Sequence, residues 1–141
     1  MSQYFKNAAT RETLWNPATR VAQLFFRMTE ALTPLADRPC GIVDLEYDEY
    51  AVDIEAYADF VDALVTRYLA SNHTILKGML GGYLPPAIAM VSRSGRTVAA
   101  LTASIERSNE AISLNVDAFD PPAEQRVLIE AAAQAERSMP L

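Results

Sequence analysis

The sequence predicts a mainly α-helical protein, in which residues 1–141 form a single domain: a bundle of about four helices with a small β element. Apolar residues recur at the spacing of one helix face in several segments, and residues that favour helix starts precede these segments. Half of the residues are hydrophobic and 21% are charged, which is typical of a globular protein. A chain of 141 residues is also long enough to bury a core without disulfide bonds.

The first helix is expected to follow short extended pieces within residues 3–15. Asn16 followed by Pro17 favours a helix start, because asparagine caps free N–H groups and proline suits the first helical turn. Pro34 predicts that this helix ends near residue 35. Its apolar residues recur at helical spacing and are expected to face the core: Val21, Leu24, Phe25, Met28, Leu32 and Leu35.

The second helix has the clearest pattern in the chain. Asp53 is suited to cap its start, and Glu55, Asp59 and Asp62 lie on the polar face. Acidic residues near a helix N-terminus are stabilised by the helix dipole, so part of this acidity has a structural reason. The opposite face forms a broad apolar stripe: Ile54, Tyr57, Ala58, Val61, Leu64, Val65, Tyr68 and Leu69.

The third element, residues 74–94, is apolar nearly all round and is therefore expected to lie at the centre of the fold. Pro85 and Pro86 each lack the N–H that a regular helix needs, and Gly81 and Gly82 favour termination. The sequence therefore predicts two half-helices, 74–81 and 86–94, with a break across residues 81–86.

Residues 97–117 fit two interpretations, a helix over their first half or a hairpin that turns at residues 107–110. The small β element is expected to combine parts of residues 3–15 and 111–117. A last helix is predicted from Pro121 with Asp120 as its cap. The helices are expected to share one core that contains Val21, Leu24, Phe25, Val61, Leu64, Tyr68, Leu80 and Leu128.

Negative charge is concentrated in residues 44–62, here called the acidic block. It holds eight carboxylates and no lysine or arginine, and the net charge of −6 would become +2 without it. Such a field attracts a cation or a basic surface, and it argues against binding to nucleic acid. The first residues lack the pattern of a secretory signal, and residues 74–94 are too interrupted to span a membrane, so a cytoplasmic location is expected.

No catalytic residue, cofactor or metal is predicted. Cys40 and His73 are the only cysteine and histidine; they would need to meet in space with a third group to form a nucleophilic site, and they are too few for zinc. The acidic block follows the ligand spacing of an EF-hand, but Glu49 stands where that loop requires glycine. Weak binding of Ca²⁺ is left open.

The leading hypothesis is a non-enzymatic binding protein, similar in role to an immunity protein or antitoxin, that engages a basic protein partner. Tyrosines interleave with carboxylates in the acidic block, and tyrosine is enriched at binding hot spots. The competing interpretation is a solvated helix start that only keeps the protein soluble. The partner-binding residues predicted are Asp44, Glu46, Tyr47, Asp48, Glu49, Tyr50, Glu55 and Asp59.

The alternative hypothesis is a small-molecule site or accessory biosynthetic enzyme, with a pocket at the helix break over residues 79–88. An interrupted helix leaves backbone polar groups free for a ligand. Close packing of small residues is the structural explanation for the same glycines. The ligand-binding residues in this alternative are His73, Gly81, Gly82 and Tyr83. The oligomeric state is not predicted.

Three motifs occur in order: Tyr4-Phe5, then Leu14-Trp15-Asn16-Pro17-Ala18, then an acidic helix start at Asp53-Ile54-Glu55-Ala56-Tyr57. In these motifs the chain is similar to an actinobacterial family of uncharacterised small proteins. The resemblance covers about residues 1–95. It implies a related fold and origin, and it implies no chemistry.

Overall fold

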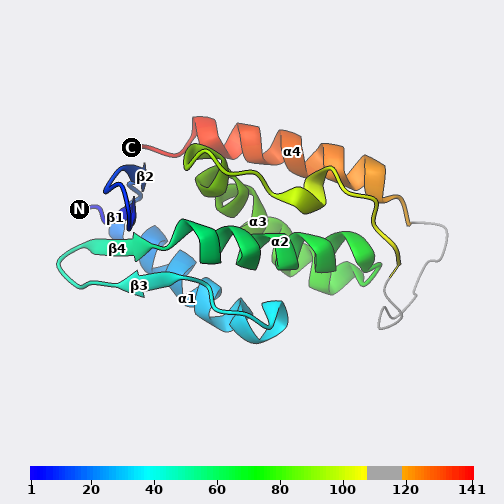
Figure 1. Cartoon of the computed structure of the whole chain (residues 1–141), viewed down its shortest axis with the longest axis horizontal. Coiled ribbons are helices and arrows are strands. Elements are labelled where there is room, and N and C mark those ends of the chain that lie inside the picture. The colour runs from blue at the N-terminus through cyan, green and yellow to red at the C-terminus, as the bar shows by residue number, and fades with distance from the viewer. Residues whose placement is uncertain (108–118) are drawn as a thin grey trace.

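The computed structural model describes residues 1–107 and 119–141, and Figure 1 shows its elements. The strands gather at one end of the molecule, and helices α2, α3 and α4 run away from them (Figure 1). In chain order the elements are β1 (Tyr4–Asn7), β2 (Thr13–Trp15), α1 (Thr19–Ala36), β3 (Ile42–Asp44), β4 (Glu49–Val52), α2 (Ile54–Ala70), α3 (Thr74–Arg93), the 3-10 helix η1 (Ala99–Leu101) and α4 (Pro121–Arg137).

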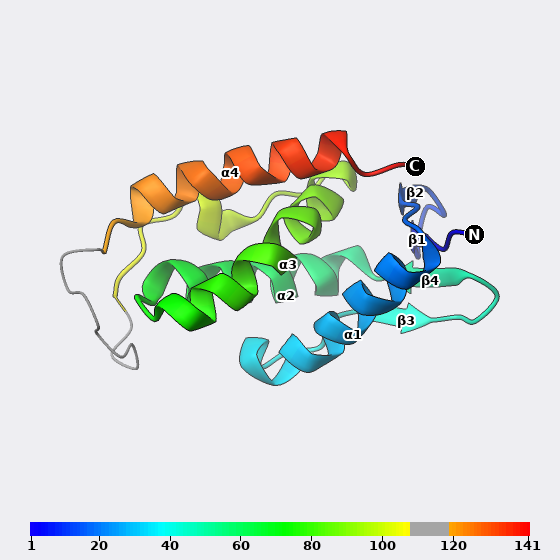
Figure 2. The same ribbon diagram turned by 180° about the vertical axis from the view of Figure 1, so that it is seen from behind.

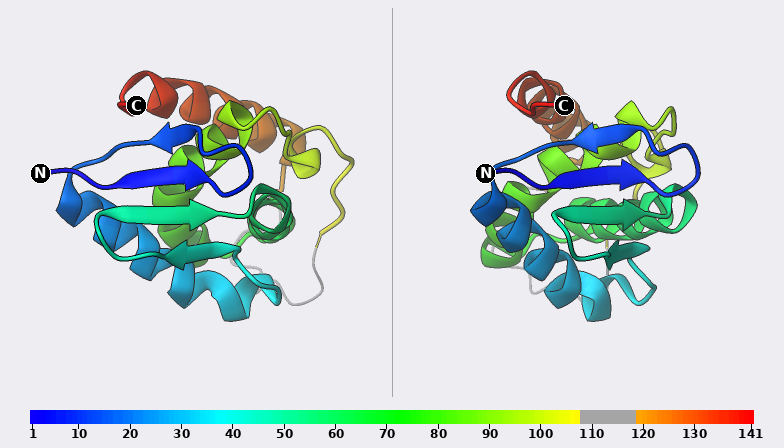
Figure 3. Two further views of the ribbon diagram at one scale, coloured as in Figure 1. Left: turned by 60° about the vertical axis from the view of Figure 1, so that its left-hand side comes forward. Right: turned by 90° about the vertical axis from the view of Figure 1, so that its left-hand side faces the viewer.

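The strands form one mixed sheet in the order β2-β1-β4-β3, so the prediction of a helical bundle is wrong. Strands β1 and β4 are parallel, with Phe5 opposite Tyr50, and an antiparallel strand flanks each of them (Figure 3). Two of the strands come from residues 42–52, for which the sequence analysis predicts no strand. Buried Tyr50 and Val52 alternate there with more exposed neighbours, which is the period of a strand. The predicted strand contribution of residues 111–117 lies outside the described residues.

Aromatic rings cover the inner face of the sheet. Phe5 stacks on Trp15 at 5.7 Å and on Tyr50 at 4.6 Å between ring centroids, one contact to each neighbouring strand. Helix α1 packs on this row through Phe25, whose ring meets Phe5 and Trp15 edge-on at 5.5 and 5.2 Å. Stacked and edge-on pairs are the favoured geometries for aromatic rings, so this cluster fixes α1 to the sheet.

The starts of α2 and α4 are confirmed. The Asp53 side chain accepts a hydrogen bond from the N–H of Ala56, and Asp120 accepts one from Ala123. Helix α1 begins later than predicted, at Thr19 and with no side-chain cap, and it ends at Ala36, close to the predicted end near residue 35.

Helix α3 is continuous from Thr74 to Arg93, so the predicted break at residues 81–86 is wrong. The two prolines leave the carbonyls of Gly81 and Gly82 without a helical donor, because each proline lies four residues further on. Gly82 is exposed to water, which can satisfy such a group. Burial of the apolar side chains around the predicted break outweighs the lost hydrogen bonds.

Most of the predicted core residues are buried, but α1 faces the core with a different set of side chains from the predicted one. Phe25, Val61, Leu64, Leu80 and Leu128 are buried, and Tyr68 is partly buried against them. Val21 and Leu24 are 47% and 61% exposed instead. The side of α1 that faces inward carries Ala22, Phe25, Thr29 and Ala36. This face therefore combines two small residues, one polar residue and one aromatic residue.

Helix α3 is the one described helix that is long and apolar enough to cross a membrane. The core helix of a soluble protein has the same composition, and α3 buries Leu80, Leu84 and Val91 among the other helices. We therefore interpret α3 as the central helix of a soluble fold.

The guanidinium of Arg93, at the end of α3, joins distant parts of the chain. It donates hydrogen bonds of 2.8 Å to the carbonyl oxygens of Leu14, Glu136 and Met139. The end of α4 is thereby attached to strand β2, and both chain ends lie beside the sheet (Figure 1).

Three buried hydroxyl groups link α1, α2 and α3. Thr29 donates its single hydroxyl hydrogen to the carbonyl of Phe25 at 2.9 Å, so the Tyr83 hydroxyl, 2.7 Å away, must donate to Thr29. The Tyr57 hydroxyl, 3.1 Å from Tyr83, must then donate to Tyr83. Each hydroxyl therefore has a partner for its hydrogen, as burial requires.

The continuous α3 predicts that Gly81→Ala raises the free energy of unfolding by about 0.5–1 kcal/mol, because alanine loses less backbone entropy in a helix. A Cβ at Gly81 meets no atom within 4 Å, so no clash opposes this gain. Urea denaturation measures the change. Destabilisation by Gly81→Ala would contradict a regular helix at this position.

The hydroxyl chain predicts that Tyr83→Phe destabilises the protein more than Tyr57→Phe. Without the Tyr83 oxygen the buried Tyr57 hydroxyl loses its acceptor, at a cost of about 1–3 kcal/mol. In Tyr57→Phe the Tyr83 hydroxyl still donates to Thr29, and the expected cost is below about 1 kcal/mol. Thermal or urea unfolding of the two variants gives the order, and the reverse order would disprove the assigned directions.

Candidate functional site

The acidic block begins on a strained turn between β3 and β4. Glu46, Tyr47 and Asp48 are consecutive residues with positive φ angles of 61°, 51° and 64°. This left-handed conformation costs a residue with a Cβ roughly 1–2 kcal/mol, and glycine normally occupies it. Tyr47 lies in the middle of the turn with 94% of its surface exposed.

Hydrogen bonds hold this turn in place. Asp44 Oδ1 accepts from the N–H of Glu46 at 2.8 Å, and the N–H of Leu45 donates to the carbonyl of Glu49 at 3.0 Å. The Tyr50 hydroxyl donates to the Gln3 side-chain oxygen at 3.0 Å. The turn is therefore fixed by its own strands and by the segment that leads into β1.

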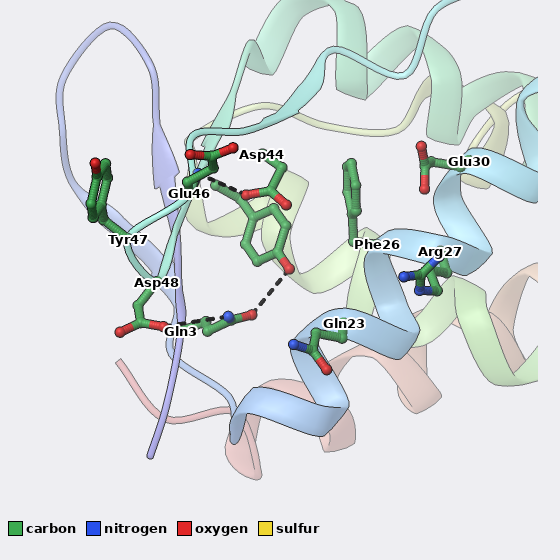
Figure 4. Close-up of a pocket in the computed structure, with 10 residues that line it drawn as sticks. Gln3, Gln23, Phe26, Arg27, Glu30, Asp44, Glu46, Tyr47 and Asp48 are labelled. Carbon is green, nitrogen blue, oxygen red and sulfur yellow. Dashed lines mark hydrogen bonds between the residues drawn. The ribbon is translucent and has the colours of Figure 1, made fainter.

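A groove of about 340 Å³, here called the acidic groove, lies between this turn and helix α1 (Figure 4). Phe26 and Tyr50 form an aromatic part of its wall, with ring centroids 5.0 Å apart. Among the described residues, Arg27 is the one cationic side chain that lines it. The residues that line the groove are Gln3, Gln23, Phe26, Arg27, Glu30, Asp44, Glu46, Tyr47, Asp48 and Tyr50.

Four carboxylates of the acidic groove, those of Glu30, Asp44, Glu46 and Asp48, form no ion pair within the described part of the chain. They outnumber the Arg27 guanidinium four to one, so the groove carries a net negative charge. Carboxylates held close together favour a cationic group beside them. An aromatic wall adds an attractive surface for a flat cation such as guanidinium.

Three of the eight predicted partner-binding residues lie elsewhere. Glu49 pairs with Lys6 at 3.0 Å and with Arg11 at 2.5 Å, and hydrogen bonds from Arg11 and Lys6 lower the pKa of this carboxylate below its ordinary value. Glu55 pairs with Arg96 at 2.9 Å, and Asp59 is exposed on α2. The structure brings together the other five: Asp44, Glu46, Tyr47, Asp48 and Tyr50.

The residues of the alternative site serve the fold. His73 caps α3, because its Nδ1 accepts a hydrogen bond from the N–H of Leu76 at 3.2 Å. Tyr83 is 1% exposed and belongs to the hydroxyl chain, and burial raises its pKa far above the ordinary value. Gly81 and Gly82 lie within a regular helix. Within the described ranges no group of three or more His, Cys, Asp or Glu residues could hold a metal.

A second groove, of about 300 Å³, lies between the end of α3, the segment around η1 and α4. Ile88, Val98, Leu101 and Ile129 give it an apolar lining. Its position differs from the pocket expected over residues 79–88, with which it shares only the end of that range.

Sequence reasoning missed the half of the acidic groove that comes from α1 and the segment before β1. Arg27 and Glu30 lie on the polar face of an amphipathic helix, where charged residues are ordinary. Nothing in that pattern shows that this face of α1 lies opposite the β3–β4 turn. Gln3 belongs to no sequence pattern that indicates a binding site.

Comparison with protein families places the chain in a known group. A family model described as a family of unknown function (DUF6086) matches residues 1–141. This match extends over the whole sequence, beyond the first 95 residues covered by the resemblance noted from the motifs. No curated protein and no solved structure matches the chain.

The strained turn predicts that Tyr47→Gly raises the free energy of unfolding by about 0.5–1 kcal/mol, because glycine adopts a positive φ without steric cost. Tyr47→Ala is the matched control: it also removes the exposed ring but keeps the Cβ that causes the strain, so no gain is expected. Urea denaturation compares the two. Equal stability of both variants would show that the turn stores no strain at Tyr47.

Proposed function

The chain belongs to this family of unknown function, and we propose that it is a non-enzymatic, cytoplasmic binding protein that engages a basic protein partner through the acidic groove. The partner would place a lysine or arginine side chain between the β3–β4 turn and α1. A role like that of an immunity protein or antitoxin fits this proposal, because such proteins neutralise a partner by binding and need no catalytic group.

The observation that carries the proposal is the excess of unpaired carboxylates in the acidic groove. Asp44, Glu46 and Asp48 line it from the turn, and Glu30 lines it from α1 (Figure 4). Like charges that line one groove repel one another, more weakly the further apart they lie. A cationic side chain would relieve that repulsion, and the Phe26 and Tyr50 rings would add contact with its flat face.

Tyr47 is the proposed anchor outside the groove. Its side chain projects away from the groove at the tip of the turn (Figure 4), where an approaching surface would meet it first. Tyrosine supplies a large contact area at a low cost in side-chain entropy. Strained residues cluster at functional sites, so three left-handed residues at this tip support a binding role for it.

The other acidic residues contribute only through the long-range field. Glu49 and Glu55 are already paired with cations, and the charges of exposed side chains are screened beyond about 8 Å at physiological salt. The small-molecule alternative at residues 79–88 is not retained, because the helix break on which it depended is absent.

An actinobacterial origin also remains a proposal. The chain has ten arginines and two lysines, a ratio that a GC-rich genome would favour. The arginine excess bears on the source of the protein and has no bearing on the partner.

The proposal is tested with the partner itself, captured by pull-down from the source organism at low salt and then purified. We expect Glu46→Gln with Asp48→Asn to slow association about tenfold, because neutral groups no longer steer a basic surface. The expected loss shrinks as salt is added. Stopped-flow or surface-based kinetics at low and physiological salt measures both effects.

The matched control is Glu55→Gln with Asp59→Asn, which removes the same charge from the other end of the acidic block. This control should change the association rate less than about twofold, since both residues lie outside the acidic groove. Equal effects of the two double variants, or binding indifferent to salt, would disprove recognition through the groove.

A further inference from the structure

Strand β3 forms an open edge of the sheet. The strand order β2-β1-β4-β3 leaves one side of β3 without a neighbouring strand among the described residues (Figure 3). Helix α1 covers one face of the sheet, since β3 and β4 lie in front of it in Figure 1 and behind it in Figure 2. Val43, Asp44 and Leu45 are exposed, so solvent reaches this strand. An open edge of this kind can pair with a strand of another chain.

The backbone of β3 directs hydrogen-bonding groups to that open side. In an antiparallel pair, successive residues turn their N–H and C=O groups alternately toward the partner strand and away from it. Leu45 faces β4, because its N–H donates to the carbonyl of Glu49 at 3.0 Å. By alternation Val43 also faces β4, whereas Ile42 and Asp44 direct their backbone groups toward the open side.

The outward backbone groups of Asp44 are available to a partner. At Ile42 the Cys40 Sγ occupies both positions, 3.5 Å from the nitrogen and 3.8 Å from the carbonyl oxygen, and sulfur is a weak hydrogen-bonding partner. The N–H and C=O of Asp44 have no hydrogen-bond partner within residues 1–107 and 119–141. An extended peptide satisfies both groups of such a residue at once, which a helix does not.

The side chains around this edge select the kind of strand. Asp44 lies on the same face of the sheet as its register partner Tyr50, and both line the acidic groove. Val43 points to the opposite face and is 56% exposed. On an added strand, the residue opposite Asp44 would lie beside a carboxylate, and its two neighbours would lie on the face of Val43. A basic residue between two apolar residues therefore fits best.

A second copy of the chain is a poor occupant of this edge. Two β3 strands side by side would bring Asp44 and the acidic turn of both copies together, and each copy has a net charge of −6. Like charges that face each other destabilise a strand pair. A short edge with acidic residues is also a protection against unwanted strand pairing, and the same charge favours a basic strand over a neutral or acidic one.

We propose that a basic segment of the partner adds to β3 as an antiparallel strand, with a lysine or arginine opposite Asp44 and an apolar residue on either side of it. Antiparallel pairing is the more stable of the two orientations. This inference rests on the proposed function, and it adds the backbone conformation of the partner and the pattern of its side chains. In strand addition, main-chain hydrogen bonds supply affinity and alternate side chains supply specificity.

The test uses the full chain and the synthetic peptide acetyl-Thr-Val-Arg-Val-Thr-amide, with binding measured by isothermal titration calorimetry at low salt. In the antiparallel pair the arginine N–H donates to the Asp44 carbonyl, whereas the N–H of the following valine points away from β3. N-methylation of the arginine nitrogen should weaken binding about tenfold, because it removes this hydrogen bond. N-methylation of that valine is the matched control and should change the affinity less than about twofold.

Replacement of the peptide arginine by glutamate should abolish binding, because it places two carboxylates opposite each other. Equal effects of the two N-methylations, or no binding of the parent peptide, overturn the strand pairing. A larger effect at the valine overturns the antiparallel orientation.

Asp44→Pro examines the same edge from the side of the protein. Proline removes the outward N–H of residue 44 and no hydrogen bond to β4, which is why edge strands tolerate it. Asp44→Asn is the matched control, since it removes the same charge and keeps the N–H. Asp44→Pro should weaken peptide binding more than Asp44→Asn, with circular dichroism showing that both variants are folded. Equal affinities of the two variants overturn the strand pairing.

Failure of this inference differs from failure of the proposed function. If Glu46→Gln with Asp48→Asn slows association of the captured partner while the two N-methylated peptides bind alike, the acidic groove binds a basic partner that adds no strand. If that double variant has no effect on the captured partner, the proposed function itself is wrong.

Discussion

The hydroxyl of Tyr83 is the one group on which the arrangement of α1, α2 and α3 depends. It accepts a hydrogen bond from Tyr57 of α2 and donates one to Thr29 of α1, inside a core that is otherwise apolar. Apolar side chains pack in many orientations at similar free energy, whereas a buried hydrogen bond is satisfied in one. The stacking of Phe25 on Tyr83 at 4.7 Å strengthens the same junction. Because α1 is fixed in this way, its polar face with Arg27 and Glu30 stands opposite the β3–β4 turn, and the acidic groove exists.

The acidic block is continuous in sequence but serves three separate purposes in space. Asp53 and Asp62 hold backbone N–H groups, of Ala56 and Ala100 respectively. Glu49 and Glu55 neutralise nearby cations. Asp44, Glu46 and Asp48, at the turn, line the acidic groove, and Asp59 is exposed on α2. A strand followed directly by a helix points successive side chains in different directions, and this geometry divides the block.

Local signals predicted α2 and α4 from the sequence, because their caps and apolar stripes lie within one segment. The sheet was missed since β3 and β4 are short and gain their stability from pairing with β1 and from the ring of Phe5, which are distant in sequence. The break in α3 was predicted from the two prolines and the two glycines before them, but burial on both sides of residues 81–86 decides the outcome. The residues that the β3–β4 turn contributes to the acidic groove could be predicted from the pattern of carboxylates and tyrosines. The residues that α1 contributes could not, because their position depends on how Thr29 and Phe25 orient that helix.

The hydrogen bonds of Arg93 also indicate the order in which the parts of the protein fold. Its contact with Leu14 joins residues 79 positions apart, and its contacts with Glu136 of α4 and with Met139 just after that helix span more than 40. Closing the long chain segments between these residues costs conformational entropy before any contact forms. Contacts between helices that are neighbours in sequence, such as α2 and α3, are therefore expected to form earlier in folding. We expect the Arg93 guanidinium to form its hydrogen bonds to the three carbonyl oxygens only after the helices have packed together. Arg93 would then fix the end of α4 to strand β2 in a late step of folding.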